Sequence, residues 1–306
     1  MIKSNEIIVS ISCITYNHDN FISQCLDGFL MQKIDFSLEI LIHDDASTDG
    51  TKEIIKQYQN KYPSIIKPIL REDNLYSKGE RGFHSRFNFS RAQGKYLALC
   101  EGDDYWTDPL KLQKQVDFLE QNKEYSLCFH DANFLYTNKS IKKFSQKYSF
   151  LQSRSDYTRK DLFKYKWFIP TASVVFRNQP MDLSYFRNIH SGDTTLYLML
   201  SKIGKFKYLS DCMSVYRITN QGIGTIVNNP EYRLHDLRKW LLLVEPYEKK
   251  FIYRAICGRL KLLLISSIKS KSFLLIIASI KNILFAFLNY IYFSFTYYFY
   301  TKKTTF

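Results

Sequence analysis

The 306-residue chain lacks several features that would assign it to a specialised class of protein. Its six cysteines are scattered without close pairs, which excludes a disulfide framework or cysteine zinc site and indicates a reducing compartment. We find no internal repeat and no low-complexity linker. The apolar run 7–14 is followed by polar residues instead of a small-residue cleavage site, so we expect a buried strand rather than a signal peptide.

Acidic residues are absent from the last fifth of the chain. From Lys249 onward there are ten Lys or Arg residues and no Asp or Glu, whereas residues 1–248 carry 33 basic and 29 acidic side chains. This asymmetry predicts an appendage that meets a polyanion or an anionic lipid surface. We therefore expect two regions, residues 1–225 and a basic, aromatic-rich, helical region at 226–306.

Short β-branched runs alternate with helical patterns in the first half of the chain, which predicts an α/β fold with a mostly parallel sheet and helices on both faces. Pro68 in the third run favours an edge strand. A helix is also expected at about 84–92. The expected strands of this half are 7–15, 38–43, 65–70 and 95–100.

The second half of the chain is less regular. It contains one further helical pattern, at 192–204, with an acid at its start. The strands expected in this half are 126–136, 172–177, 205–211 and 213–217.

Polar clusters follow three of the expected strands. They read TYN at 15–17, DDAS at 44–47 and EGDD at 101–104. Ligands of open α/β sheets bind at the carboxyl ends of the strands. We therefore expect these three clusters, which are distant in sequence, to converge on one site.

The EGDD cluster places three acids within four residues, where like charges repel. Paired carboxylates suit Mg²⁺ or Mn²⁺, since these ions prefer oxygen ligands and commonly join carboxylates to substrate phosphates. The alternative is that Asp103 caps a turn and Asp104 is solvated. Because two further polar strand ends need an explanation, we favour a cation that arrives with a diphosphate.

Several motifs, in order along the chain, resemble the family 2 glycosyltransferases. They read VSISCITYNHDNFISQCLDGFLMQ, EILIHDDASTDGT and GKYLALCEGDDYWTDPLKLQKQVDFLE, followed by a later acid before a helix. The resemblance covers about residues 7–220 and implies a GT-A fold, with a Rossmann-like central sheet, in 1–225. The C-terminal helical tail lies outside it.

The resemblance implies an inverting transferase that uses a nucleoside diphosphate sugar, with UDP as the nucleotide by family habit. The acceptor would be a hydroxyl of a glycan or lipid-linked molecule in surface polysaccharide synthesis. It further implies that Tyr16 and Asn17 line the base pocket. Asp45, with Asp44 beside it, would contact the base and ribose.

The resemblance also assigns the acidic motif. Glu101, Gly102 and Asp103 occupy the family's D-x-D positions, with Glu in place of the first Asp. Asp103 takes the metal-binding position, and Asp104 stays open as the alternative ligand. Arg217 would hold the diphosphate, although the segment has Thr219 where the family pattern places a histidine.

Asp193 corresponds to the family's catalytic acid, the general base that removes the acceptor proton. Asp is also a preferred helix N-cap, and a helix is expected to follow. If Asp193 acts as the base, a second group has to supply the cap of this helix.

The C-terminal region has 19 uncharged residues at 282–300, enough to span a bilayer. Abundant Tyr and interspersed basic residues favour an interfacial amphipathic helix, on the inner face of the cell membrane of a cytoplasmic enzyme. A true span, or packing on another subunit or the core, remains open. Nucleic acid is disfavoured because the basic residues are interleaved with Leu and Ile.

Two other functions stay open at the level of sequence. The Glu101 and Thr219 departures are compatible with a decayed, non-catalytic protein that binds a nucleotide sugar. Another nucleotide-dependent transferase would usually have a phosphate loop rich in Gly and Lys or Arg, and none follows the first expected strand.

Overall fold

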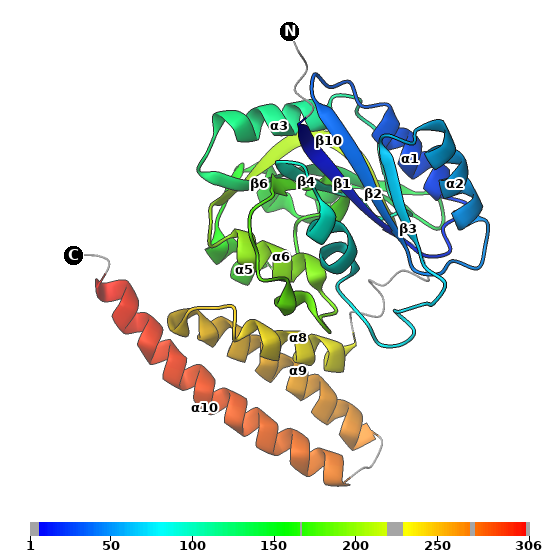
Figure 1. Ribbon diagram of the computed structural model, residues 1–306. Helices are drawn as coiled ribbons and strands as arrows, with labels where there is room; N and C mark the ends of the chain where they lie inside the picture. Colours follow the sequence, from blue (N-terminus) through cyan, green and yellow to red (C-terminus); the bar gives the residue numbers. More distant parts are fainter. Residues whose placement is uncertain (1–5, 166, 219–228, 270–272, 304–306) are drawn as a thin grey trace. The chain divides into compact units, whose positions relative to one another are not determined.

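The structure is a computed structural model that describes residues 6–165, 167–218, 229–269 and 273–303 (Figure 1). The chain forms two compact units. The first comprises residues 1–188 and 199–220, and the second comprises 189–198 and 221–306. The expected boundary after residue 225 lies outside the described residues.

A ten-stranded sheet is the centre of the first unit, with the order β3-β2-β1-β4-β9-β6-β10-β5, while β7 pairs with β6 and β8 pairs with β10. This bears out the predicted α/β class. Because β3 lies at one edge, Pro68 removes no hydrogen bond from a central ladder. The strands are β1 (Ile7–Thr15), β2 (Ser37–Asp44), β3 (Ile66–Leu70), β4 (Tyr96–Leu99), β5 (Tyr105–Trp106), β6 (Tyr125–Tyr136), β7 (Ile141–Lys143), β8 (Asp156–Tyr157), β9 (Val175–Arg177) and β10 (Lys205–Ile218).

The long pairings in this sheet are parallel. They join β1 to β2, β1 to β4, β2 to β3 and β6 to β10. The short strands β5, β7, β8 and β9 pair antiparallel. The prediction of two strands over 205–217 was wrong, because β10 continues through irregularities next to Cys212 that shift its register without ending it.

Helices and short helical turns surround the sheet of the first unit. The expected helix at 84–92 is instead a π turn followed by a 3-10 turn, η1 and η2. The helical elements are α1 (Ile22–Leu30), α2 (Thr51–Lys61), η1 (His84–Asn88), η2 (Phe89–Arg91), α3 (Lys111–Gln121), α4 (Phe144–Lys147), η3 (Ser149–Gln152), α5 (Arg159–Tyr165), η4 (Thr171–Ser173) and η5 (Leu183–Phe186).

The two faces of β1 differ in chemistry because side chains alternate along a strand. Ile11 on one face joins an apolar core with Leu26 of α1 and Leu112 of α3. Ser10 and Ser12 on the other face bond to polar side chains, and Ser12 Oγ lies 2.7 Å from His84 Nδ1 of η1. Long helices therefore cover the apolar face, and the short turns cover the polar face.

The second unit is helical, in agreement with the prediction of a helical C-terminal tail. Helices α9 and α10 lie side by side (Figure 1), and the rings of Tyr253 and Phe293 stack with centroids 5.6 Å apart. Helix α6 (Gly192–Leu200) belongs to this unit as far as Leu198. The other helical elements are α8 (Pro230–Trp240), η6 (Pro246–Glu248), α9 (Lys249–Lys269) and α10 (Phe273–Lys303).

Candidate active site

Three polar loops meet at the carboxyl edge of β1, β2 and β4, here called the rim. Thr15 and Asp44, the last residues of β1 and β2, are paired in parallel register. The loop after β4 continues along β1, because the Gly102 N–H donates to the Ile14 carbonyl oxygen at 2.9 Å. The structure therefore brings the three predicted clusters to adjacent strand ends.

Hydrogen bonds tie the first cluster to the second. The Asn17 N–H donates to Ser47 Oγ at 2.9 Å, and the Thr48 N–H donates to Asn17 Oδ1 at 2.8 Å. Asn17 and Ala46 both adopt the left-handed region, with φ of 53° and 64°. Asn accepts this conformation more readily than Ala does. Tyr16, the residue before Asn17, is 43% exposed.

Asp44 and Asp45 are both buried at the rim. Asp44 accepts hydrogen bonds from the Ser47 hydroxyl and backbone N–H, and burial raises its pKa against the opposing effect of these bonds. Asp45 accepts the backbone N–H groups of Leu75 and Tyr76, each at 2.9 Å. Asp45 thus holds the following loop, and a contact with a nucleobase would compete with these two bonds.

The acidic cluster packs closely against β1. A Cβ atom at Gly102 would lie 2.6 Å from Thr15 Oγ1, so only glycine fits between its two acidic neighbours. Burial raises the pKa of Asp103, and it raises that of Asp104 well above the usual range, with a further increase from the neighbouring carboxylates. The cluster is therefore short of positive charge.

Arg217 of β10 distinguishes the two neighbouring aspartates. Its backbone N–H donates to Asp104 Oδ1 at 2.7 Å, and its guanidinium donates to the Asp103 carbonyl oxygen. The guanidinium carbon lies 4.8 Å from the Phe21 ring centroid and 4.5 Å from that of Tyr105. Asp104 is 1% exposed, whereas the Asp103 side chain is 20% exposed. Asp104 thus anchors β10, and Asp103 is the more accessible of the two.

Two histidines that we did not predict complete the acidic cluster. His18 Nε2 lies 3.9 Å from Asp103 Oδ2, and His84 Nε2 lies 3.8 Å from Glu101 Oε1. Within the described part of the chain, Glu101 Oε2 and His84 Nε2 are buried without a hydrogen-bond partner. Buried polar atoms normally have partners, so these two atoms keep hydrogen-bonding capacity that a ligand or water could use. His18 adjoins the TYN motif, but no sequence signal pointed to His84.

A family model described as "Glycosyl transferase family 2" matches residues 10–179, more than half of the 306-residue chain. The chain belongs to this family. Its rim lies within the matched residues, apart from the contribution of Arg217.

Sequence relatives of this chain include bacterial proteins. The uncharacterized protein Rv1520 of Mycobacterium tuberculosis is 40% identical over 217 residues, which are 70% of this chain and 60% of that protein. The "Putative teichuronic acid biosynthesis glycosyltransferase TuaG" of Bacillus subtilis is 27% identical over 226 residues, 71% of this chain and 82% of that protein. The match to the mycobacterial relative therefore spans less than two thirds of its length.

Solved structures support a GT-A fold for this chain. The crystal structure of Staphylococcus aureus TarS 1–349 in complex with UDP-GlcNAc superimposes with a TM-score of 0.59 at 15% identity. The alignment covers 90% of this chain and 89% of that chain. At this identity the likeness concerns the fold.

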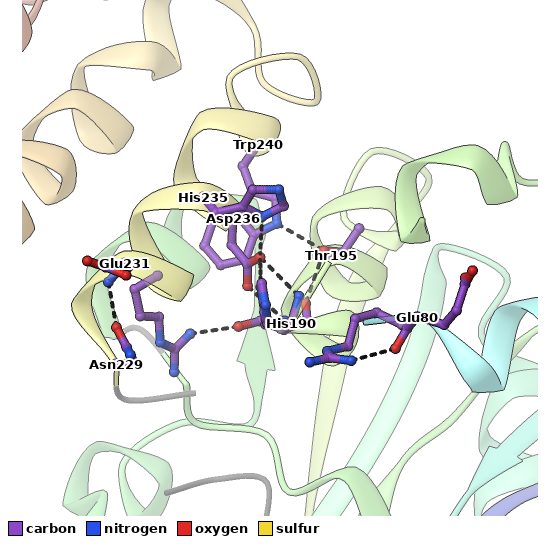
Figure 2. A network of polar contacts seen from close by, with 11 residues as sticks. Glu80, His190, Thr195, Asn229, Glu231, His235, Asp236 and Trp240 are labelled. Atoms are coloured by element: carbon purple, nitrogen blue, oxygen red, sulfur yellow. Dashed lines mark hydrogen bonds and ion pairs between the residues drawn. The ribbon is translucent and has the colours of Figure 1, made fainter. Parts of the chain in front are cut away.

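Asp193 lies in the first turn of α6, within the second unit. Its Oδ1 accepts the Thr194 N–H at 2.6 Å. Asp236 of α8 accepts the N–H groups of His190 and Ser191, at 3.0 and 2.8 Å, immediately before the helix (Figure 2). A second carboxylate thus binds the amides at the helix entry, so the segment does not depend on Asp193 as its cap.

Trp106 follows the acidic cluster closely in sequence but packs in the core. Its ring packs 4.7 Å from that of Phe29, and its Nε1 donates to the Ala172 carbonyl oxygen at 2.8 Å. Thr219 lies outside the described residues.

Among the described residues, one helical segment, Leu275–Phe295 of α10, is long and apolar enough to cross a membrane. Its mean hydropathy is 1.6, and 6% of it is buried. Its exposed apolar side chains include Leu275, Ile280, Leu284, Phe285, Leu288 and Phe295.

Proposed function

We propose that this glycosyltransferase is an inverting enzyme that transfers a hexosyl or N-acetylhexosaminyl group from a UDP-sugar. The acceptor is a hydroxyl of a glycan or lipid-linked molecule in surface polysaccharide synthesis. The observation that carries the proposal is that the exposed Tyr16 lies on the same rim as the acids around Asp103, whose negative charges lack enough positive charge nearby. An aromatic surface suits a nucleobase, and an uncompensated acid cluster suits a cation held with a diphosphate.

Two similar proteins support the choice of donor and of pathway class. TarS was crystallised with UDP-GlcNAc, and TuaG is named for teichuronic acid biosynthesis, which is the basis for choosing UDP and a surface polysaccharide. Tyr16 and Asn17 form the base side of the site in this proposal. Asp44 and Asp45 hold the loops that shape it, through bonds to Ser47 and to the backbone after β3.

The rim residues fit Mg²⁺ or Mn²⁺. Asp103 supplies a partly exposed carboxylate, Glu101 has one oxygen without a hydrogen-bond partner in the described residues, and Asp104 keeps a second oxygen beside its bond to Arg217. All of these donors are hard oxygens, as these cations prefer. Asp103 is the main ligand in this proposal, with Asp104 as the alternative. The bound cation would offset the negative charge that the diphosphate gains as it leaves.

Asp193 acts as the general base in this proposal. The acceptor oxygen bonds to the anomeric carbon on the face opposite the diphosphate, and the bond from that carbon to the diphosphate oxygen breaks. The electron pair leaves with the diphosphate, and the acceptor proton passes to the Asp193 carboxylate. A well-placed general base typically contributes about 10²–10⁴-fold to the rate. Arg217 adds positive charge beside Asp103 on the side of the leaving group.

The first experiment is a thermal-shift screen of nucleotide sugars with and without Mn²⁺, because the correct donor raises the melting temperature by mass action. Donor hydrolysis and sugar transfer are then measured separately. Asp103→Asn is expected to lose both activities, and Asp193→Asn is expected to lose transfer while hydrolysis by water continues.

Asp117→Asn, an exposed acid on α3, is the matched control and should retain both activities. Transfer that persists in Asp193→Asn would remove Asp193 as the base. Donor binding without turnover in the parent protein would support the decayed binding protein instead.

The second unit is proposed to bind the inner face of the cell membrane. Its α10 helix exposes an apolar segment, and the chain from Lys249 onward has ten basic and no acidic residues. Apolar side chains with flanking positive charge suit an anionic leaflet. Such binding would keep a cytoplasmic enzyme near a lipid-linked acceptor.

Vesicle sedimentation tests the membrane proposal. The protein is expected to bind phosphatidylglycerol vesicles more strongly than phosphatidylcholine vesicles, and Phe285→Ser with Leu288→Ser should weaken that binding. Ile141→Ser is the matched control, because Ile141 is 61% exposed on β7 of the first unit. Equal binding by the parent and the double variant would contradict the proposal.

A further inference from the structure

We infer that His190, His235 and Asp236 of the second unit form a site for a divalent transition metal of the zinc class. His190 precedes α6, and the other two residues lie on α8. One ligand atom from each residue lies within 4.8 Å of the others. Figure 2 shows the two imidazoles and the carboxylate pointing toward one another. This site is separate from the cation site proposed at the rim. The inference that it exists does not depend on the proposed function.

The spacing of the ligand atoms fits a zinc site. Asp236 Oδ1 lies 3.2 Å from His190 Nδ1 and 3.4 Å from His235 Nδ1. Metal–ligand bonds of about 2.1 Å in a tetrahedron place neighbouring ligand atoms about 3.4 Å apart. The two separations from Asp236 Oδ1 therefore match those expected around a bound zinc ion.

Hydrogen bonding alone explains this arrangement poorly. Asp236 Oδ1 also accepts the His190 backbone N–H at 3.0 Å, so three nitrogen atoms surround one oxygen. A carboxylate oxygen offers about two lone-pair positions. If both Nδ1 atoms are unprotonated and bind a metal ion together with Oδ1, neither imidazole donates a hydrogen bond to this oxygen. Oδ1 then accepts only the His190 backbone N–H.

The side chains of the site are held in place before a metal binds. Asp236 is fully buried, and its Oδ2 accepts the Ser191 N–H at 2.8 Å. The His190 ring stacks on Tyr232, with centroids 4.2 Å apart and planes 12° apart. Such outer contacts orient metal ligands and strengthen binding.

The donor set selects the class of metal. Two imidazole nitrogens and one carboxylate suit zinc and similar first-row ions, whereas Mg²⁺ prefers oxygen ligands alone. His235 also lines a cavity of about 520 Å³ with residues that include Leu234 and Arg238. Of the three ligands, His235 is the one that faces this cavity.

The consequence for this chain is a fixed entry to α6. The site would join the residue three positions before Asp193 to α8, and so restrain the turn that carries the proposed base. In this role the metal acts on position and does not take part in the reaction. Only this consequence rests on the proposed function.

The test uses the full chain, freed of metal by a chelator and titrated with Co²⁺ in excess Mg²⁺. We expect one equivalent of Co²⁺ with the visible absorption bands of tetrahedral coordination, which Zn²⁺ then displaces. His235→Gln should weaken binding by at least about tenfold, since loss of even an outer contact costs 10–100-fold. The His235 side chain is 43% exposed, so this variant should fold, as circular dichroism will verify.

His18→Gln is the matched control, because it makes the same change in the rim of the first unit. It should leave the Co²⁺ bands and the Zn²⁺ affinity unchanged. Equal affinity in the parent and His235→Gln, or loss of the bands in His18→Gln, would overturn the inference. Donor binding with Mn²⁺ is measured in the same variants, so failure of the zinc-class site and failure of the rim proposal give different results.

Discussion

Asp104 of the first unit and Asp236 of the second are both buried, with exposures of 1% and 0%, but their surroundings are opposite. Asp104 stands beside two other acids and accepts one backbone N–H, from Arg217 at 2.7 Å. Asp236 accepts two backbone N–H groups, from His190 and Ser191, and two imidazoles adjoin it.

Burial by itself therefore does not decide whether a carboxylate stabilises a fold. Around Asp104, burial and the charges of Asp103 and Glu101 disfavour the ionised form. Around Asp236, donors surround both oxygens and offset the cost of burial. The first arrangement is suited to receiving a cation, and the second holds two chain segments together.

Replacing Asp236 should have the largest effect on stability. Asp236→Ala removes the acceptor of two buried backbone N–H groups, and we expect the free energy of unfolding to fall by about 2–4 kcal/mol. Urea unfolding of the metal-free protein measures this loss. Asp117→Ala on the exposed face of α3 should change stability by less than about 0.5 kcal/mol. A loss below 1 kcal/mol in Asp236→Ala would remove the contrast between the two aspartates.

Gly102 tests how tightly the acidic cluster is packed. Gly102→Ala places a Cβ atom 2.6 Å from Thr15 Oγ1, and overpacking of this kind should lower stability by about 1–3 kcal/mol. Gly258→Ala in α9 meets nothing within 4 Å and should raise stability by up to about 1 kcal/mol through helix propensity. Thermal melts of both variants provide the measurement, and the same sign for both would contradict the packing argument.

Asp104 should make the metal-free protein less stable as the pH rises. Because its pKa is higher in the folded than in the unfolded chain, the unfolded chain loses the proton first, from about pH 4 upward. Asp104→Asn keeps an acceptor for the Arg217 N–H and removes the charge. We expect it to be more stable than the parent at pH 7 by about 1 kcal/mol, with the difference vanishing near pH 3.

Melting curves between pH 3 and pH 7.5 in a chelating buffer test this prediction, and Mn²⁺ should reduce the difference by stabilising the parent. A variant that is less stable than the parent at every pH would show that Asp104 is structural in the same sense as Asp236.

His18 should produce the smallest of these effects. Burial raises the pKa of Asp103, and the adjacent His18 opposes that increase. His18→Gln should therefore raise the pH midpoint of Mn²⁺ binding by a few tenths of a unit, since the metal competes with a proton for Asp103. Electron paramagnetic resonance of free Mn²⁺ measures the midpoint. His235→Gln leaves the rim unchanged and should give the midpoint of the parent.

Much of the rim could be predicted from local sequence. The ends of β1, β2 and β4 are parallel neighbours, so the TYN, DDAS and EGDD clusters had to lie at one edge once the strands were recognised. The roles of the individual residues remain proposals. His84 could not be found this way, because it reaches Ser12 across 72 residues and lies in a π turn where the sequence predicted an ordinary helix.

Other outcomes depended on contacts with distant segments. Strand β10 continues past Cys212 because β6 pairs with it on both sides of the irregularity. Asp236 binds the entry to α6 from 45 residues away, which a search for caps near Asp193 does not reveal.

The sequence by itself determined most of the strand and helix pattern of the first half, the acids at the strand ends and the basic, apolar C-terminal region, because periodicity and composition act locally. Only the tertiary structure decided that Arg217 binds Asp104 and leaves Asp103 accessible, and that two histidines meet Asp236. These outcomes require segments distant in the chain to meet, and their hydrogen bonds form only after burial has brought the segments together.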